Sequence, residues 1–137
     1  MTTMNLQLTD GVHILTLTNA ENGGDNRLTT EVVEEYLAAL DIVEQYQGNT
    51  ALLLTCSHEK TFCTGINLDW LLPLNDADRR EFTTAFETLL CRLALLSAPT
   101  VACINGNAYA GGAIVASATD FRLMRSDRGR FCYPEVD

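Results

Sequence analysis

Apolar and polar positions alternate in the first part of the chain, and this alternation then gives way to a helical period. Residues 5–8 and 12–18 alternate on either side of residues 10–11, Asp-Gly, which is a turn sequence typical of tight β-hairpins. From Thr29 or Thr30 onward, the apolar residues fall at the spacing of an amphipathic helix. The pattern therefore predicts a hairpin followed by a helix.

Beyond this helix the chain alternates between short apolar strands and further helices. The expected strands are residues 50–56, 99–104 and 119–124, with an extended piece at 131–133, and the expected helices are residues 69–74, a helix from Asp76 or Asp78 to Leu96, and residues 111–118. Residues 51–55 carry no charge, which predicts a strand covered on both faces. Asp78 and Glu81 resemble a capping box. This β-α-β-α series predicts an α/β fold, and the length suits one domain, residues 1–137.

Two glycine-containing turns each follow a strand and precede a helix. They are residues 62–68, FCTGINL, and residues 104–114, INGNAYAGGAI. A helix start leaves backbone N–H groups without an intrahelical acceptor, and two such groups converging on one oxygen form an oxyanion hole. The residues alone also fit a purely structural role, in which Gly111 and Gly112 let the helix pack closely on the sheet. Because the chain has no Gly-x-Ser-x-Gly nucleophile motif, a carboxylate base is the better partner for an oxyanion hole.

Composition narrows the classes of function. A net charge of −9 argues against nucleic acid, whose phosphates need clustered Lys and Arg. No apolar run reaches the roughly 18–20 residues that span a membrane, and residues 1–5 lack the features of a signal peptide. Five cysteines without C-x-x-C spacing fit free thiols, and His13 and His58 lack ligand spacing, so no metal is expected. We expect a soluble cytoplasmic protein without a membrane or nucleic-acid partner.

The combination of both glycine turns resembles the N-terminal half of the crotonase superfamily (enoyl-CoA hydratase/isomerase). The hairpin, the segment Asn26-Arg27-Leu28 and the stretch from Gly111 to Asp120 add to the likeness, which spans nearly the whole chain. The resemblance implies a crotonase-like spiral of ββα units (the ClpP/crotonase fold), of which this chain is the N-terminal part. It also implies an acyl-CoA substrate, with coenzyme A as part of that substrate and no covalently bound cofactor, and a homotrimer or dimer of trimers.

The resemblance also implies roles for particular residues. The peptide N–H groups of Ile66 and Gly111 would hold the thioester oxygen, and Glu135 would be the catalytic carboxylate. Substrate binding would involve Gly65, Asn67, Gly112, Arg27 and Leu28. Ile114 stands where the hydratases of the family carry a glutamate, and an isoleucine cannot activate water. The single carboxylate, together with the segment from Asp120 to Asp137, favours the Δ3,Δ2-enoyl-CoA isomerase branch, with Glu135 partly buried and acting as a proton shuttle.

Two alternatives stay open at this point. Another crotonase reaction, such as hydration or thioester hydrolysis, would use a carboxylate supplied beyond residue 137. A non-catalytic homologue would bind acyl-CoA without turning it over. The chain ends soon after a short strand, so we expect a domain truncated at its C-terminus, whose missing half completes the CoA pocket and the trimer contact. A eukaryotic source would make a peroxisomal or mitochondrial location possible.

Overall fold

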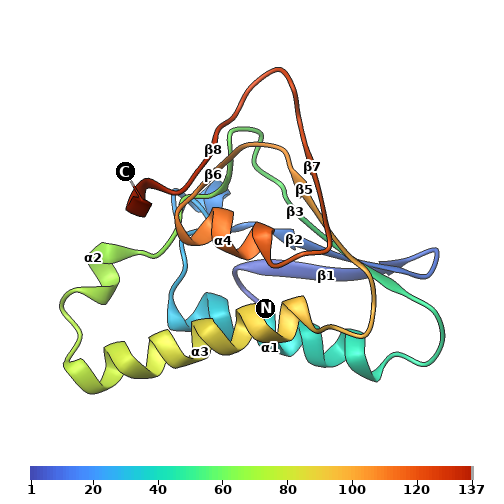
Figure 1. Cartoon of the computed structure of the whole chain (residues 1–137), viewed down its shortest axis with the longest axis horizontal. Coiled ribbons are helices and arrows are strands. Elements are labelled where there is room, and N and C mark those ends of the chain that lie inside the picture. The colour runs from blue at the N-terminus through green and yellow to red at the C-terminus, as the bar shows by residue number, and fades with distance from the viewer. Residues whose placement is uncertain (137) are drawn as a thin grey trace.

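Two β-sheets form the framework of the molecule. The computed structural model describes residues 1–136, and Figure 1 shows the arrangement of their elements. One sheet has five strands in the order β1-β2-β3-β5-β7, and the other has three strands in the order β4-β6-β8. The strands of the first sheet are β1 (Met4–Thr9), β2 (Val12–Leu17), β3 (Ala51–Cys56), β5 (Thr100–Ile104) and β7 (Phe121–Met124), and those of the second are β4 (Thr61–Cys63), β6 (Asn107–Tyr109) and β8 (Phe131–Cys132). Among the described strands, the β1–β2 hairpin is antiparallel and the other pairings are parallel.

The strands follow one another as repeats of a single unit. A strand of the five-stranded sheet leads to a short strand of the three-stranded sheet, as in β3–β4, β5–β6 and β7–β8. Helices α2 (Leu68–Leu71) and α3 (Asp76–Ala94) follow β4, helix α4 (Gly111–Ser117) follows β6, and the 3₁₀ turn η2 (Pro134–Val136) follows β8. This succession is the spiral of ββα units that the resemblance implied, and the fold prediction is confirmed. Strands β4 and β6 were expected only as turns, because three residues are too few to display an alternating pattern.

The two long helices lie side by side on one face of the five-stranded sheet (Figure 1). Helix α1 (Thr30–Gln45) begins as expected, with the Thr29 hydroxyl accepting the N–H of Val32 at 3.4 Å. The start of α3 differs from the prediction, because the side chain of Asn75, and not that of Asp78, caps it. The Asn75 Oδ1 accepts the N–H of Asp78 at 2.8 Å. An Asn side chain satisfies an unpaired first-turn donor as well as Asp or Ser does.

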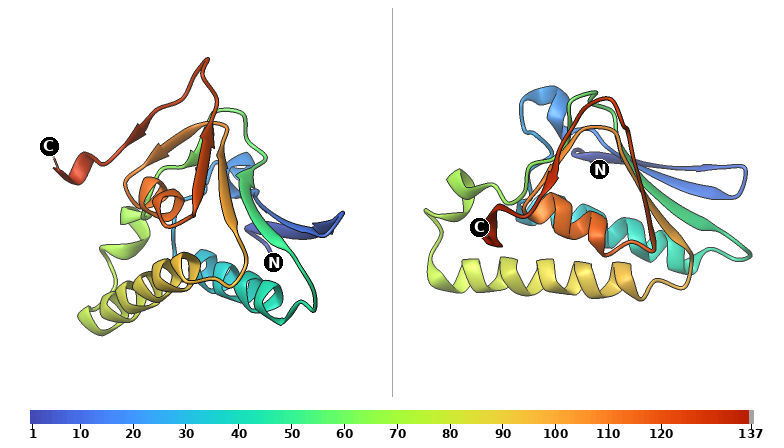
Figure 2. Two further views of the ribbon diagram at one scale, coloured as in Figure 1. Left: turned by 45° about the vertical axis from the view of Figure 1, so that its right-hand side comes forward. Right: turned by 45° about the horizontal axis from the view of Figure 1, so that its top comes forward.

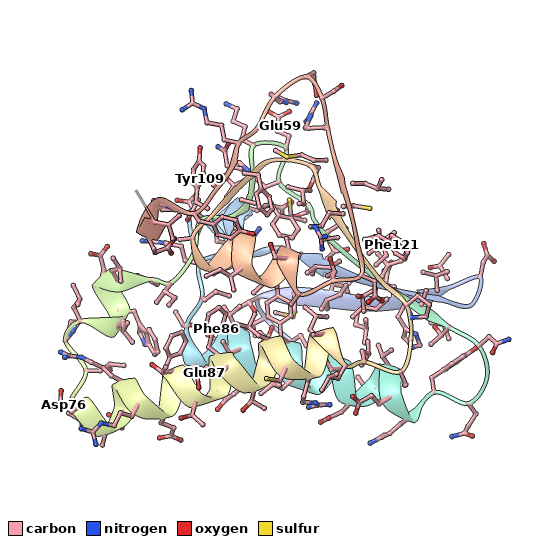
Figure 3. All side chains as sticks on the ribbon, in the orientation of Figure 1. Glu59, Asp76, Phe86, Glu87, Tyr109 and Phe121 are labelled. Atoms are coloured by element: carbon pink, nitrogen blue, oxygen red, sulfur yellow. The ribbon has the colours of Figure 1, made fainter. Side chains whose placement is uncertain are left out.

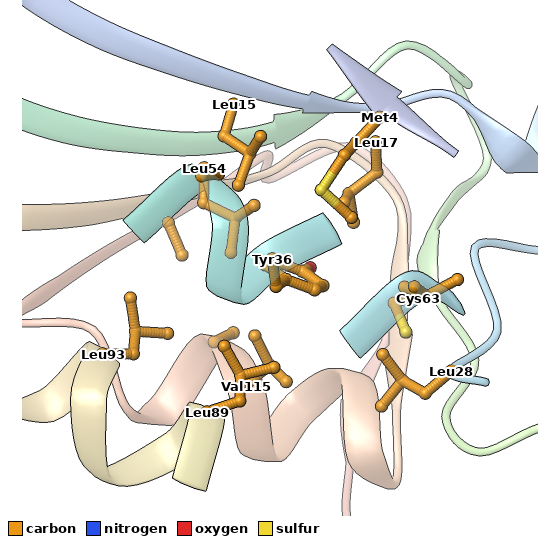
Figure 4. Packing of buried hydrophobic residues seen from close by; sticks show 14 of the residues in the cluster. Met4, Leu15, Leu17, Leu28, Tyr36, Leu54, Cys63, Leu89, Leu93 and Val115 are labelled. Carbon is orange, nitrogen blue, oxygen red and sulfur yellow. The ribbon is translucent and has the colours of Figure 1, made fainter. Parts of the chain in front are cut away.

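The core lies between the five-stranded sheet and the helices. Figure 4 shows Leu15 and Leu54 of the sheet facing Tyr36 of α1, Leu89 of α3 and Val115 of α4, all of them buried. Strand β3 alternates between fully and partly buried residues, so the expectation of cover on both faces was wrong for the described residues. The helices cover only one face of this sheet, which explains the alternation.

Candidate active site

The carboxyl ends of the three parallel strands β4, β6 and β8 carry the residues that the resemblance singled out. Ile66 comes three residues after β4, Gly111 two residues after β6 and Glu135 three residues after β8. Parallel strands end at the same edge of a sheet, and ligands of open α/β sheets bind beyond that edge. All three residues line one cavity of about 340 Å³, whose wall consists of Thr64, Ile66, Leu68, Ala110, Gly111 and Glu135.

The turn that carries Ile66 is held by the backbone of Leu28. The Leu28 N–H donates to the Gly65 carbonyl at 2.8 Å, and the Leu28 carbonyl accepts the N–H of Asn67 at 2.9 Å. Gly65 has φ +102°, a conformation that side chains rarely tolerate, and a Cβ atom there would lie 2.9 Å from the Ala110 Cβ. The two bonds to Leu28 leave the N–H of Ile66 on the other side of the chain, without a protein acceptor within residues 1–136.

The turn that carries Gly111 is the start of α4. No side chain caps this helix, and within the described residues the N–H of Gly111 also has no protein acceptor. Ala110 precedes it with φ 50° and ψ −123°, which is a strained conformation for a residue other than glycine. A Cβ atom on Gly111 would lie 3.0 Å from the Leu28 Cδ1 and 3.5 Å from the Ile66 nitrogen. The two turns therefore touch, and Ile66 and Gly111 line the same cavity.

Glu135 reaches the cavity from the C-terminal segment. The left view of Figure 2 shows η2 at the outer end of the C-terminal segment, beyond β8, and the Glu135 side chain is exposed, whereas partial burial was expected. The difference arises because few elements of residues 1–136 pack against this segment. It is attached to the rest of the molecule by the pairing of β8 with β6 and by a hydrogen bond between the hydroxyls of Tyr133 and Ser117 of α4. The cavity wall therefore carries one acid from this segment and two residues whose N–H groups have no protein acceptor within residues 1–136.

The other predicted binding residues fall into two groups. Leu28 and Gly65 shape the cavity by positioning its turns, and Gly112 packs α4 against β4, because a Cβ atom there would lie 2.2 Å from the Cys63 carbonyl oxygen. Asn67 and Arg27 are not among the residues that line the cavity. The Asn67 Oδ1 accepts the N–H of Trp70 at 3.2 Å and so caps α2. The Arg27 guanidinium lies 3.7 Å from the exposed Asp69 carboxylate. The roles assigned to these residues stay predictions.

Three residues of the cavity wall were missed by the sequence analysis. Thr64, Leu68 and Ala110 flank the residues that were named. Their position next to the glycine turns is the signal that could have identified them. Ile114 is partly buried against the core and carries no acid.

The buried thiols near the site are not nucleophiles. Cys63 donates its S–H to the carbonyl of Asn26 at 3.1 Å, and burial raises the pKa of this thiol to about 12. Burial likewise raises the pKa of Cys56 to about 11. A thiolate is the reactive form, so both thiols are inert at neutral pH. Residues 1–136 bring no three His, Cys, Asp or Glu side chains together as a metal site, and they contain no helix long and apolar enough to cross a membrane.

Comparison with known proteins agrees with this fold. The family described as Enoyl-CoA hydratase/isomerase matches residues 7–137, and the chain belongs to this family. Enoyl-CoA delta isomerase 3 of Arabidopsis thaliana is 31% identical over 127 residues, which are 90% of this chain and 52% of that protein. The peroxisomal enoyl-CoA delta isomerase 2 of the same plant is 30% identical over 129 residues, with the same shares.

Hydratases are similar to the chain as well. The short-chain-enoyl-CoA hydratase of Clostridium acetobutylicum is 31% identical over 111 residues, which are 81% of this chain and 42% of that protein. The crystal structure of an enoyl-CoA hydratase from Bacillus anthracis superposes with a TM-score of 0.81 at 26% identity, covering 89% of this chain and 47% of that one. The chain thus spans about half the length of the relatives it matches.

Proposed function

We propose that the protein is an isomerase that converts a 3-enoyl-CoA into a 2-enoyl-CoA. The observation that carries this proposal is the set of groups on the cavity wall. Among residues 1–136, Glu135 is the one carboxylate there, and it shares the wall with Ile66 and Gly111, whose N–H groups have no protein acceptor within these residues. A double-bond shift needs one base that removes a proton and returns it elsewhere. Hydration needs a second acid, and Ile114 occupies the position where the hydratases of this family carry theirs.

The reaction follows from these three groups. The thioester oxygen of the substrate accepts hydrogen bonds from Ile66 and Gly111, which makes the C2 proton more acidic. Glu135 removes this proton, the C2–H electron pair enters a dienolate, and the negative charge rests mainly on the oxygen. The same carboxyl group returns the proton at C4, and the double bond then lies between C2 and C3. Each oxyanion donor contributes about 3–4 kcal/mol to the transition state in comparable sites, and a positioned base contributes roughly 10²–10⁴-fold.

A direct assay with two substrates tests the proposal. The purified protein is given 3-hexenoyl-CoA and crotonyl-CoA in separate reactions, and formation of 2-hexenoyl-CoA and of 3-hydroxybutyryl-CoA is followed by mass spectrometry and chromatography. We expect isomerisation of the first substrate to exceed hydration of the second. Preferred hydration would reject the isomerase proposal in favour of the hydratase reaction. Binding of CoA esters without turnover of either would indicate the non-catalytic alternative.

A further inference from the structure

A second cavity adjoins the candidate active site. It has a volume of about 530 Å³ and is lined by Thr64, Tyr109, Ala110, Arg130, Cys132 and Pro134. Thr64 and Ala110 also line the first cavity, and Pro134 directly precedes Glu135. Figure 3 shows Tyr109 on the side of the molecule where the C-terminal segment lies. A ligand whose thioester lies on Ile66 and Gly111 therefore has two neighbouring spaces for its two ends.

The backbone of Arg130 is held in place at the wall of this second cavity. Its N–H donates to the Asn107 side-chain oxygen at 3.0 Å, and its carbonyl accepts the N–H of Ala108 at 2.8 Å. Gly129, with φ +92°, makes the preceding bend, and a Cβ atom there would lie 3.1 Å from the Gly106 carbonyl carbon. The backbone at Arg130 is thus fixed by strand β6 even though the side chain itself is exposed.

Within residues 1–136, six of the nine cationic side chains have partners, whereas Lys60, Arg80 and Arg130 have none, and of these three Arg130 is the one that lines the second cavity. The chain has nine Lys and Arg residues and a net charge of −9. Within residues 1–136, five of them form ion pairs: Arg27, Arg79, Arg92, Arg125 and Arg128. Arg122 donates to backbone carbonyls. Among residues 1–136, the side chain of Arg130 makes no ion pair or hydrogen bond, and no carboxylate lines its cavity.

We propose that this second cavity binds an anionic group, a phosphate or a carboxylate, of the same ligand, and that Arg130 pairs with it. This inference rests on the proposed function, because the proposed function places the thioester of the ligand in the first cavity, at Ile66 and Gly111. A guanidinium presents a planar set of donors that matches both anions. Two parts of a CoA ester could supply the charge: the phosphates of the CoA end, or a carboxylate at the far end of a dicarboxylic acyl group.

Arg130→Gln tests the proposal, with Arg128→Gln as the matched control. Arg128 is in the same loop, loses the same charge, pairs with Glu59 at 3.4 Å and does not line the cavity. The probes are 3-hexenoyl-CoA, 3-hexenoyl-pantetheine, which lacks the phosphates, and 3-hexenedioyl-CoA, which adds a terminal carboxylate. Arg130→Gln is expected to raise KM roughly 10- to 100-fold with kcat unchanged, as for loss of a hydrogen bond to a charged group.

The pattern across probes identifies the source of the charge. If Arg130→Gln raises KM for both CoA esters and not for the pantetheine ester, the phosphates are the partner of Arg130. If it raises KM for the hexenedioyl ester alone, the terminal carboxylate is the partner. Arg130→Lys keeps the charge and is expected to restore most of the affinity. No change with any probe, or an equal change in Arg128→Gln, would overturn the proposal.

Calorimetric binding separates this inference from the proposed function. Titration of the wild-type protein and of both glutamine variants with CoA and with the saturated counterpart of each ester, which has no double bond to shift, measures Kd without turnover. Absence of isomerisation by the wild-type protein would reject the proposed function alone, because an Arg130-dependent Kd would still assign the anion site. Isomerisation with a Kd that does not depend on Arg130 for any ester would reject the anion site alone.

Discussion

The two sides of the candidate active site are built differently. On the amide side, the turns with Ile66 and Gly111 contact each other, and the fully buried Leu28 holds the first of them by two backbone hydrogen bonds. On the carboxylate side, Glu135 stands on an exposed 3₁₀ turn that is fastened to α4 through Tyr133. One side is part of the core, and the other is attached to its surface.

This difference matches what each side has to do. Amides stabilise a developing charge well only if they are already oriented, because reorganisation during the reaction would consume the gain. A general base has to lie within reach of its proton, and its geometry tightens when substrate binds. Substitutions on the amide side should therefore change activity and stability together, whereas those on the carboxylate side should change activity alone.

The largest effect is expected for Glu135→Gln. The amide keeps the size of the side chain and cannot accept a proton, so kcat for 3-hexenoyl-CoA should fall roughly 10²–10⁴-fold. The free energy of unfolding, measured by urea titration, should stay within about 0.5 kcal/mol because the side chain is exposed. Retained turnover would show that another group is the base, and a large loss of stability would contradict the separation of the two sides.

Cysteine labelling compares the two sides without any substrate. Burial raises the pKa of Cys63 on the amide side from an ordinary 9.0 to about 12, whereas Cys132 on the carboxylate side is exposed. At pH 8 the thiolate population of Cys63 should be about 1,000-fold below that of an ordinary thiol, so iodoacetamide should modify Cys132 long before Cys63. Peptide mass spectrometry over time measures both rates. Similar rates in the absence of denaturant would mean that β4 opens easily.

Gly65→Ala should affect both activity and stability. A methyl group at this position meets the Cβ of Ala110 at 2.9 Å, and the φ of +102° is strained for alanine. We expect a destabilisation of about 1–3 kcal/mol and a loss of roughly 10²–10³-fold in kcat as the Ile66 N–H turns away. Urea unfolding and the isomerase assay measure the two effects. Gly23→Ala is the matched control, because that glycine also has positive φ with nothing within 4 Å of the added methyl group. It should lose stability and keep its kcat.

The smallest effect is expected for Tyr133→Phe, which removes only the hydroxyl that bonds to Ser117. A single hydrogen bond contributes about 0.5–1.5 kcal/mol to the stability of the structure that it holds. Loss of this bond should leave Glu135 less well positioned, so kcat should fall a few-fold to tenfold while KM changes little. Hydrogen exchange of residues 131–136 should become faster in parallel. Ser117→Ala should give the same result, and the double variant should add nothing further. Additive losses would show that the two hydroxyls act separately.

The sequence was informative about long elements and less so about short ones. The hairpin and helices α1 and α3 have enough residues to display their periods, but β4 and β6 do not. Ile66, Gly111 and Glu135 came from a resemblance of motifs, and the roles of Arg27 and Asn67 were drawn from the same source although these side chains bond to Asp69 and to the start of α2. Arg130 was not identified from the sequence, because its place beside the site depends on the pairing of β6 with β8.

The repeating strand pairs have a consequence for how such a protein changes its chemistry. Each of three successive units supplies one residue of the cavity wall at the end of its short strand, so the two amides and the acid of the proposed reaction belong to separate units. In that mechanism, a new side chain in the third unit would alter what happens after the enolate forms, while the first two units would go on stabilising that intermediate. A single scaffold can in this way diversify its reactions one module at a time.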